Sequence, residues 1–237
     1  KQRIYCAGAI SQLLRDNIAT DQIPLLVQFI TTNLELKDTK TDFNLCSVIL
    51  PIIKKIGEEA ANKIFTAFSA QIKVTEDEEQ LSAWLTVLSK IIKNYNIQEE
   101  PVNSLVASIM SGELAIFHGS LPHITMPPIV SPFYFIRAFI KKYPTKGAPL
   151  CKQLVEWLKF TPFTSMQSLL LPLTAGLQSG CFDQELSRQF ADILKAFLAK
   201  LDLGDTSQIA SVCTALNSLY NIDKQILTPA VDFLRPL

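Results

Sequence analysis

Two histidines, His118 and His123, are the only ones in the chain, and they lie close together in the sequence. Two imidazoles could begin a metal site, but a third ligand is then needed, and Glu113 is the only nearby candidate. Ordinary loop histidines with common hydrogen bonds explain the same pattern, and we favour that interpretation. The chain has no Ser-His-Asp grouping, no glycine-rich phosphate loop and no His-Glu-x-x-His pattern. We therefore expect no enzymatic activity, no cofactor and no bound metal, and no small-molecule substrate is evident.

Basic side chains recur near the ends of the first helices of successive predicted helix pairs. They are Arg15, Lys54, Lys55, Lys93, Lys141 and Lys142. If these helices stack in register, the charges form a basic ridge that could follow the phosphates of single-stranded RNA. Cations also favour helix C-termini because they offset the helix dipole there, and this explanation needs no ligand. Both interpretations stay open, and the second is the simpler one.

Aromatic side chains cluster in one segment and could stack on nucleic-acid bases. They are Phe133, Tyr134, Phe135 and Phe139. Their helical spacing beside Ile136 and Ile140 favours a place in the core instead. We likewise expect Trp84 and Trp157 to lie between helix layers. The acidic run 76–79 could contact a basic partner, but acids at the start of a helix explain it more simply.

Composition points to an all-α protein. Of its 237 residues 48% are hydrophobic, glycine occurs only 8 times, and alternating polar and apolar residues are almost absent. Its 22 basic and 22 acidic residues give a formal charge of +0, which argues against a generally basic nucleic-acid binder. No uninterrupted apolar run reaches the roughly 18–20 residues of a membrane span. The chain starts at Lys1, and we interpret it as a processed form, a fragment or the ordered part of a longer protein.

The five cysteines are widely spaced and include no Cys-x-x-Cys pair, so neither a disulfide framework nor a zinc site is indicated. We expect an intracellular protein, and the cysteines do not distinguish the cytoplasm from the mitochondrion.

The segment 206–234 is the clearest unit of the predicted architecture. Ile209, Val212, Leu216 and Leu219 recur at helical spacing, residues 221–223 break the pattern, and Thr228 with Pro229 starts a second helix. Two short helices with one apolar face each cannot bury both faces alone. Such a unit therefore requires neighbours of the same kind.

Earlier segments resemble this unit. Apolar spacing, caps and breakers predict helices at 3–15, 21–36, 42–56, 58–73, 81–92, 98–111, 133–143, 148–160, 165–178 and 183–201. The predicted turns lie at Gly57, Asn96, Lys146-Gly147, Gly180 and Asn221. Their spacing predicts a right-handed α-solenoid of about six antiparallel helix pairs forming one domain over residues 1–237. An irregular bundle of helices is the alternative.

Residues 112–128 depart from the helical pattern. The segment contains several prolines and both histidines, and we interpret it as a long loop with a short helix near Leu114. Long loops in compact repeats tend to be functional, so we expect this insertion to contact a partner. The candidate contact residues are Phe117, His118, His123 and Met126.

Two kinds of helical repeat are similar to parts of this chain. The segments SVILPIIKKIG and SLLLPLTAGLQSG, with Pro51 and Pro172, resemble the proline-bent first helix of HEAT-type repeats. The segment IASVCTALNSLYNID is similar to the repeats of octotricopeptide and heptatricopeptide RNA-binding proteins of organelles. The aspartate and arginine of a HEAT ladder are missing. These resemblances imply helical repeats and transfer no functional residue.

The sequence therefore favours a non-catalytic scaffold that binds other protein subunits in a large intracellular or organellar complex. The alternative is a single-stranded RNA binder of the organellar helical-repeat class, which would use the basic ridge.

Overall fold

The computed structural model describes residues 22–34, 39–118, 132–161, 166–198 and 206–222, and every regular element within these ranges is helical. The predicted all-α class is confirmed. The chain divides into two compact units, which we call the N-terminal unit (Lys1–Pro122) and the C-terminal unit (His123–Leu237) and describe separately. The expectation of one domain over residues 1–237 stays a prediction.

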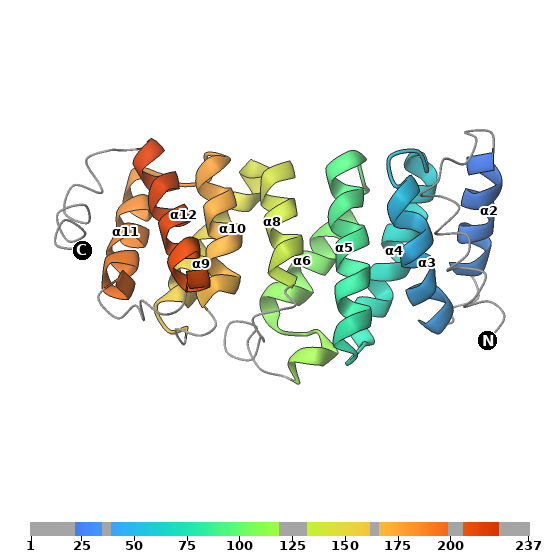
Figure 1. Ribbon diagram of the computed structural model, residues 1–237, viewed down its shortest axis with the longest axis horizontal. Helices are drawn as coiled ribbons and strands as arrows, with labels where there is room; N and C mark the ends of the chain where they lie inside the picture. The colour runs from blue at the N-terminus through green and yellow to red at the C-terminus, as the bar shows by residue number, and fades with distance from the viewer. Residues whose placement is uncertain (1–21, 35–38, 119–131, 162–165, 199–205, 223–237) are drawn as a thin grey trace. The chain divides into compact units, whose positions relative to one another are not determined.

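The described part of the N-terminal unit contains five α-helices and one short 3-10 helix (Figure 1). They are α2 (Ile23–Leu34), α3 (Thr39–Ile52), α4 (Glu58–Val74), α5 (Glu78–Asn94), α6 (Glu99–Ser111) and η2 (Ala115–Phe117). Helix α4 contacts α2, α5, α6 and η2, and α3 contacts α2 and α5. Alternate helices therefore pack side by side, with α3 beside α5 and α4 between α2 and α6.

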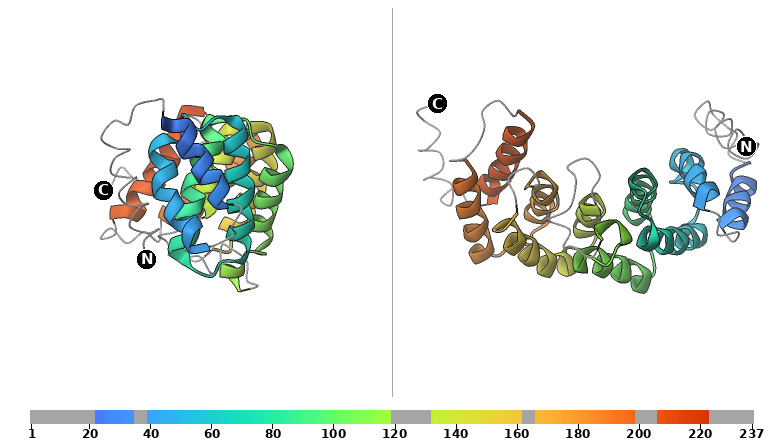
Figure 2. Two further views of the ribbon diagram at one scale, coloured as in Figure 1. Left: turned by 90° about the vertical axis from the view of Figure 1, so that its right-hand side faces the viewer. Right: turned by 90° about the horizontal axis from the view of Figure 1, so that it is seen from below.

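The described part of the C-terminal unit contains five α-helices (Figure 1). They are α8 (Pro132–Lys142), α9 (Pro144–Leu158), α10 (Met166–Gln178), α11 (Gln184–Leu198) and α12 (Thr206–Ile222). Helix α10 lies between α8 and α12, and α9 contacts α11. The right-hand view of Figure 2 shows α8, α10 and α12 in one row and α9 and α11 in a second row.

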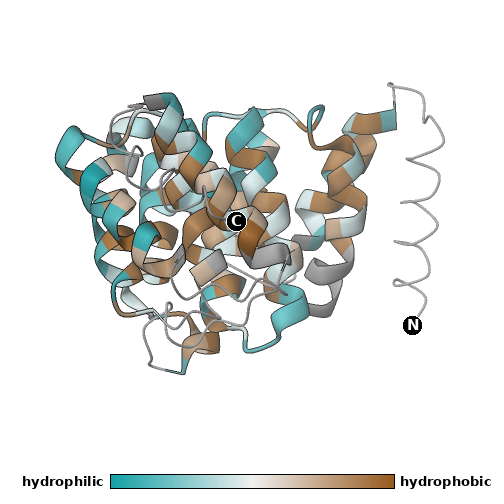
Figure 3. Ribbon diagram, turned by 60° about the vertical axis from the view of Figure 1, so that its left-hand side comes forward, coloured by the Kyte–Doolittle hydropathy of each residue, from teal (hydrophilic) through white to brown (hydrophobic). Residues whose placement is uncertain are grey.

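The cores of both units come from the apolar stripes that the spacing predicts. Ile64, Phe65 and Phe68 of α4 are fully buried, and so is Trp84 of α5. The rings of Phe68 and Trp84 lie 6.1 Å apart between their centroids, which places the two helices in aromatic contact. Figure 3 shows hydrophobic and hydrophilic residues on each helix, as expected for helices that are covered on one side.

Side chains cap the starts of two helices, one at Asp77 within the acidic run and one at the predicted cap Asp183. The Asp77 carboxylate accepts a hydrogen bond from the Gln80 N–H at 3.0 Å at the start of α5. Asp183 accepts one from the Leu186 N–H at 2.7 Å at the start of α11. Gly57 and Gly180 have φ angles of 80° and 73°, so they end the preceding segments as predicted.

Two predicted boundaries were wrong. The helix predicted over 42–56 instead begins at Thr39, so the polar residues just before Asp42 belong to α3. The turn at Lys146-Gly147 is instead part of α9, which begins at Pro144. Gly147 is buried, and a Cβ atom there would lie 3.2 Å from the Ile140 backbone. This glycine therefore serves the close packing of α8 and α9, not a turn.

The burial of Trp84 can be tested by substitution. Trp84→Ala should lower the free energy of unfolding by about 3–5 kcal/mol, because it leaves a cavity beside Phe68. Trp84→Phe should cost well under half of that. The smaller ring keeps part of the contact, and it removes a buried indole N–H that has no hydrogen-bond partner among the described residues, an arrangement that costs roughly 1–3 kcal/mol.

Urea denaturation followed by circular dichroism measures both effects. Val74→Ala is the control because Val74 is 70% exposed, and it should change stability by no more than about 0.5 kcal/mol. Equal costs for Trp84→Ala and Val74→Ala would contradict the assignment of Trp84 to the core.

Candidate interaction surface

The described part of the predicted partner loop follows α6 directly. Gly112 ends that helix in a left-handed conformation, and η2 follows and contacts α4. The short helix predicted near Leu114 is confirmed as η2. Phe117 is only 2% exposed, so its side chain is a core contact and is not accessible to a partner. His118 is exposed and has a φ angle of 49°.

His123 and Met126 lie outside the described residues, so the proposed contact through them is not tested. The same holds for a metal site that would combine both histidines. Across the described ranges, no group of three or more His, Cys, Asp or Glu side chains is placed to hold a metal ion.

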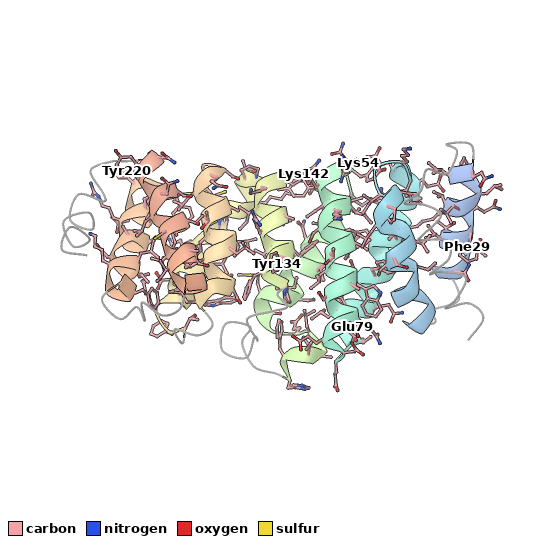
Figure 4. All side chains as sticks on the ribbon, viewed as in Figure 1. Phe29, Lys54, Glu79, Tyr134, Lys142 and Tyr220 are labelled. Atoms are coloured by element: carbon pink, nitrogen blue, oxygen red, sulfur yellow. The ribbon has the colours of Figure 1, made fainter. Side chains whose placement is uncertain are left out.

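The predicted basic ridge lies partly in each unit, and its two parts are described separately. In the N-terminal unit Lys54 and Lys55 follow the end of α3, and Lys93 lies in the last turn of α5. All three side chains are exposed. Figure 4 shows Lys54 and Glu79 at opposite edges of this unit. Glu79 lies in the first turn of α5. Arg15 lies outside the described residues.

Acidic side chains accompany the lysines at this edge of the N-terminal unit. Glu58 and Glu59 begin α4, and Glu99 and Glu100 begin α6. The Gln98 N–H donates to the Asn62 side chain at 2.9 Å, which holds the starts of α4 and α6 together. Each basic helix end is thus followed by an acidic helix start, as expected where charges offset helix dipoles. This edge has mixed charge and is not a basic surface.

The C-terminal unit differs at the corresponding junction between α8 and α9. Lys141 and Lys142 end α8, and α9 has no acid in its first turn but instead carries Lys146. The Lys146 ammonium lies 5.9 Å from the centre of the Tyr143 ring, a cation–π contact. We call Lys141, Lys142 and Lys146 the basic corner. Figure 4 shows Lys142 and Tyr220 at the same edge of this unit.

One side of α8 carries the predicted ridge residue Lys141 together with Tyr134, which was expected in the core, and Arg137, which was not selected. Phe133, Phe135 and Phe139 are buried as predicted, but Tyr134 is 53% exposed. Tyr134, half-buried Arg137 and exposed Lys141 follow each other at helical spacing on the side opposite Ile136 and Ile140. The prediction for Tyr134 was therefore wrong, because that residue belongs to the outward stripe. The same helical periodicity of the sequence also predicts that Arg137 lies on this outward side.

Arg137 lines a groove that runs over α10 between α8 and α12. Its volume is about 240 Å3. The side chains that shape it include Arg137, Leu171, Thr174, Gln178, Ala210 and Thr214. We call it the α10 groove. It joins residues about 75 positions apart, and periodicity alone does not place α10 and α12 beside α8.

A second hollow lies between α9 and α11, with a volume of about 490 Å3. Two of its charged residues form local ion pairs. Lys159, in the turn after α9, pairs with Glu156 at 2.6 Å, and Asp192 of α11 pairs with Lys195 of the same helix at 3.1 Å. These ion pairs are local and surface-exposed, so they contribute little to a binding site. We assign no function to this hollow.

Cys151 and Cys181 form a buried thiol pair in the C-terminal unit. The Cys181 thiol donates a hydrogen bond to the Pro144 carbonyl at 3.3 Å, which joins the start of α9 to the turn after α10. Burial raises the pKa of Cys151 far above its ordinary value, and the neighbouring Cys181 raises it further. Burial also raises the pKa of Cys181. Both side chains are therefore protonated and weakly nucleophilic at neutral pH.

This thiol pair predicts a loss of stability at alkaline pH. An unfolded cysteine loses its proton near pH 8.5, whereas folded Cys151 keeps it. The unfolded chain then binds fewer protons than the native one, so the free energy of unfolding falls as pH rises above about 8.5. Cys151 should contribute a slope of about 1.4 kcal/mol per pH unit there.

Urea denaturation of the wild type and Cys151→Ala at pH 7 and pH 10 measures this slope. At pH 7 the thiol is protonated in both states, so the difference between the two proteins gives the packing cost of the substitution alone. We expect the wild type to lose more stability than the variant between the two pH values. Parallel losses would show that Cys151 titrates normally.

Comparison with known proteins finds no matching family model, no matching curated protein and no matching solved structure. None of the described helices is long and apolar enough to cross a membrane. The similarity to HEAT and organellar repeat proteins therefore stays a prediction.

Proposed function

We propose that this protein is a non-catalytic helical-repeat scaffold that binds other proteins. The proposal includes a right-handed α-solenoid of about six helix pairs. It is supported by the packing of alternate helices within each unit, where α4 lies between α2 and α6 and α10 lies between α8 and α12. Elements that contact mainly their near neighbours in sequence are typical of repeat proteins, whose stacked surfaces bind extended partners.

The observation that carries the proposal is the outward side of the α8, α10 and α12 row. This side holds exposed Tyr134 and the α10 groove, whereas the opposite sides of these helices are buried in the core. An accessible face that combines an aromatic ring, an arginine and a groove has the composition of protein-binding surfaces. The raised pKa values of Cys151 and Cys181 also favour a role without nucleophilic thiols.

Purification under mild conditions from the native source tests the proposal. Proteins that accompany the chain should be identified by mass spectrometry with and without ribonuclease treatment. We expect defined protein partners that remain after ribonuclease, because protein contacts do not depend on RNA. Recovery of the chain without any protein partner would contradict the scaffold function.

A second candidate function is binding of single-stranded RNA. It is favoured by the basic corner, which has no acid in the adjoining first turn of α9. Lysine–phosphate contacts make RNA affinity fall with added salt. For single strands the logarithm of the binding constant falls by roughly 0.7 per contacted phosphate for each unit of the logarithm of salt concentration. Replacing Lys141, Lys142 and Lys146 by Gln should then weaken binding of a fluorescent oligouridylate and reduce its salt slope by about 2.

The matched control is Lys54→Gln with Lys55→Gln in the N-terminal unit. These lysines precede Glu58 and Glu59, so their removal should change RNA affinity less than the substitutions in the basic corner. Fluorescence anisotropy at several salt concentrations measures both variants. Equal RNA affinity for the wild type and the basic-corner variant would exclude this use of the corner.

A further inference from the structure

The α10 groove has only one charged side chain among the residues that shape it. That side chain is Arg137, which is half-buried and makes no hydrogen bond or ion pair with the described residues. A guanidinium that is partly removed from water favours a carboxylate or phosphate, since a planar anion accepts two of its hydrogen bonds. No acidic side chain lines the groove to satisfy it from within.

Two hydroxyls on the other walls of the groove act as acceptors, whereas the Gln178 amide, which also lines it, carries N–H donors as well as an oxygen. The Thr174 hydroxyl donates its hydrogen to the Leu170 carbonyl at 2.7 Å, and the Thr214 hydroxyl donates to the Ala210 carbonyl at 2.7 Å. A hydroxyl whose hydrogen is already used presents only lone pairs to a ligand. The floor and far wall therefore favour a ligand with hydrogen-bond donors, and the wall at Arg137 favours an anion.

A peptide combines these two properties. Its backbone N–H groups are donors at regular intervals, and an aspartate or glutamate side chain supplies the carboxylate. A nucleic-acid backbone carries a negative charge at every phosphate, and in RNA its only donors are the 2′-hydroxyls, so several phosphates would lie in a groove that offers one cation. The small Ala210 side chain lets a backbone approach α12 closely, and Leu171 offers an apolar contact.

We propose that the α10 groove binds an extended acidic peptide segment of a partner protein, with a carboxylate of that segment on Arg137. This inference rests on the proposed scaffold function and names the site and the chemistry of the partner. Tyr134 lies one turn before Arg137 and Lys141 one turn after it on the same side of α8, so they extend the contact along that helix.

Selection from a random peptide library displayed on phage tests the inference with the full chain as the target. We expect the selected peptides to be enriched in Asp and Glu. Their synthetic forms should bind Arg137→Leu about tenfold or more weakly than the wild type, because the peptide carboxylate loses its partly buried guanidinium partner. Ala210→Trp fills the groove from the exposed side of α12 and should weaken the same peptides.

Arg188→Leu is the matched control. Arg188 is an exposed residue of α11 that does not line the groove, so its loss removes the same charge and should leave peptide affinity unchanged. Replacing the peptide acid by its amide should weaken binding to the wild type, and Arg137→Leu should then weaken it no further. Circular dichroism of each variant reports whether it folds. If Arg137→Leu is unfolded, Ala210→Trp and the amide peptides still decide the result.

Three outcomes would overturn the inference: no selected peptide, selected peptides without acids, or peptides that bind Arg137→Leu as tightly as the wild type. Displacement of the peptides by oligouridylate would assign the groove to RNA instead. Purification of Arg137→Leu from cells separates this result from the scaffold function. If all protein partners remain with the variant, the scaffold stands and the groove assignment fails.

Discussion

Burying apolar helix stripes that one neighbour cannot cover is the constraint on which the structure depends. On α4, Phe65 and Phe68 are both fully buried, and α4 meets α2, α5 and α6 to achieve this. On α10, contacts with α8, α9 and α12 do the same. Within each unit a helix therefore packs against more than one neighbour, and this packing determines which side of the helix faces outward. The outward side of α8 is one result.

Much of the fold could be predicted because helical spacing and side-chain caps are local properties. The apolar positions of α5, the acids at its start and the cap Asp183 were predicted from residues within one or two turns. The structural role of each glycine was harder to predict, because glycine serves both in turns and in close helix packing. Gly57 has a positive φ and ends a segment, whereas Gly147 lies inside α9 and gives space to Ile140. Only the contact with the neighbouring helix distinguishes them.

The candidate site could be predicted only in part, for the same reason. Lys141 and Lys142 were selected from their place in the sequence, and Arg137 could have been found from the outward stripe of α8. The α10 groove needs Thr174 and Thr214 beside Arg137, and that placement depends on contacts between three helices. The hydroxyl hydrogen bonds that make its walls accepting are also invisible in the sequence.

The junctions between consecutive helices differ in charge between the two units, and the first turns of the helices explain the difference. In the N-terminal unit the acids at the start of α4 and α6 offset the lysines that precede them. At the start of α9 Pro144 occupies the first turn, and its fixed φ angle favours the helix start without an acid. The first turn of α9 therefore adds no negative charge at the basic corner. Lys141 lies about 6 Å along the axis from Arg137, within the screening length of roughly 8 Å at physiological salt. An approaching carboxylate is therefore attracted by the corner before Arg137 binds it, so the lysines should affect the association rate and Arg137 the lifetime of the complex.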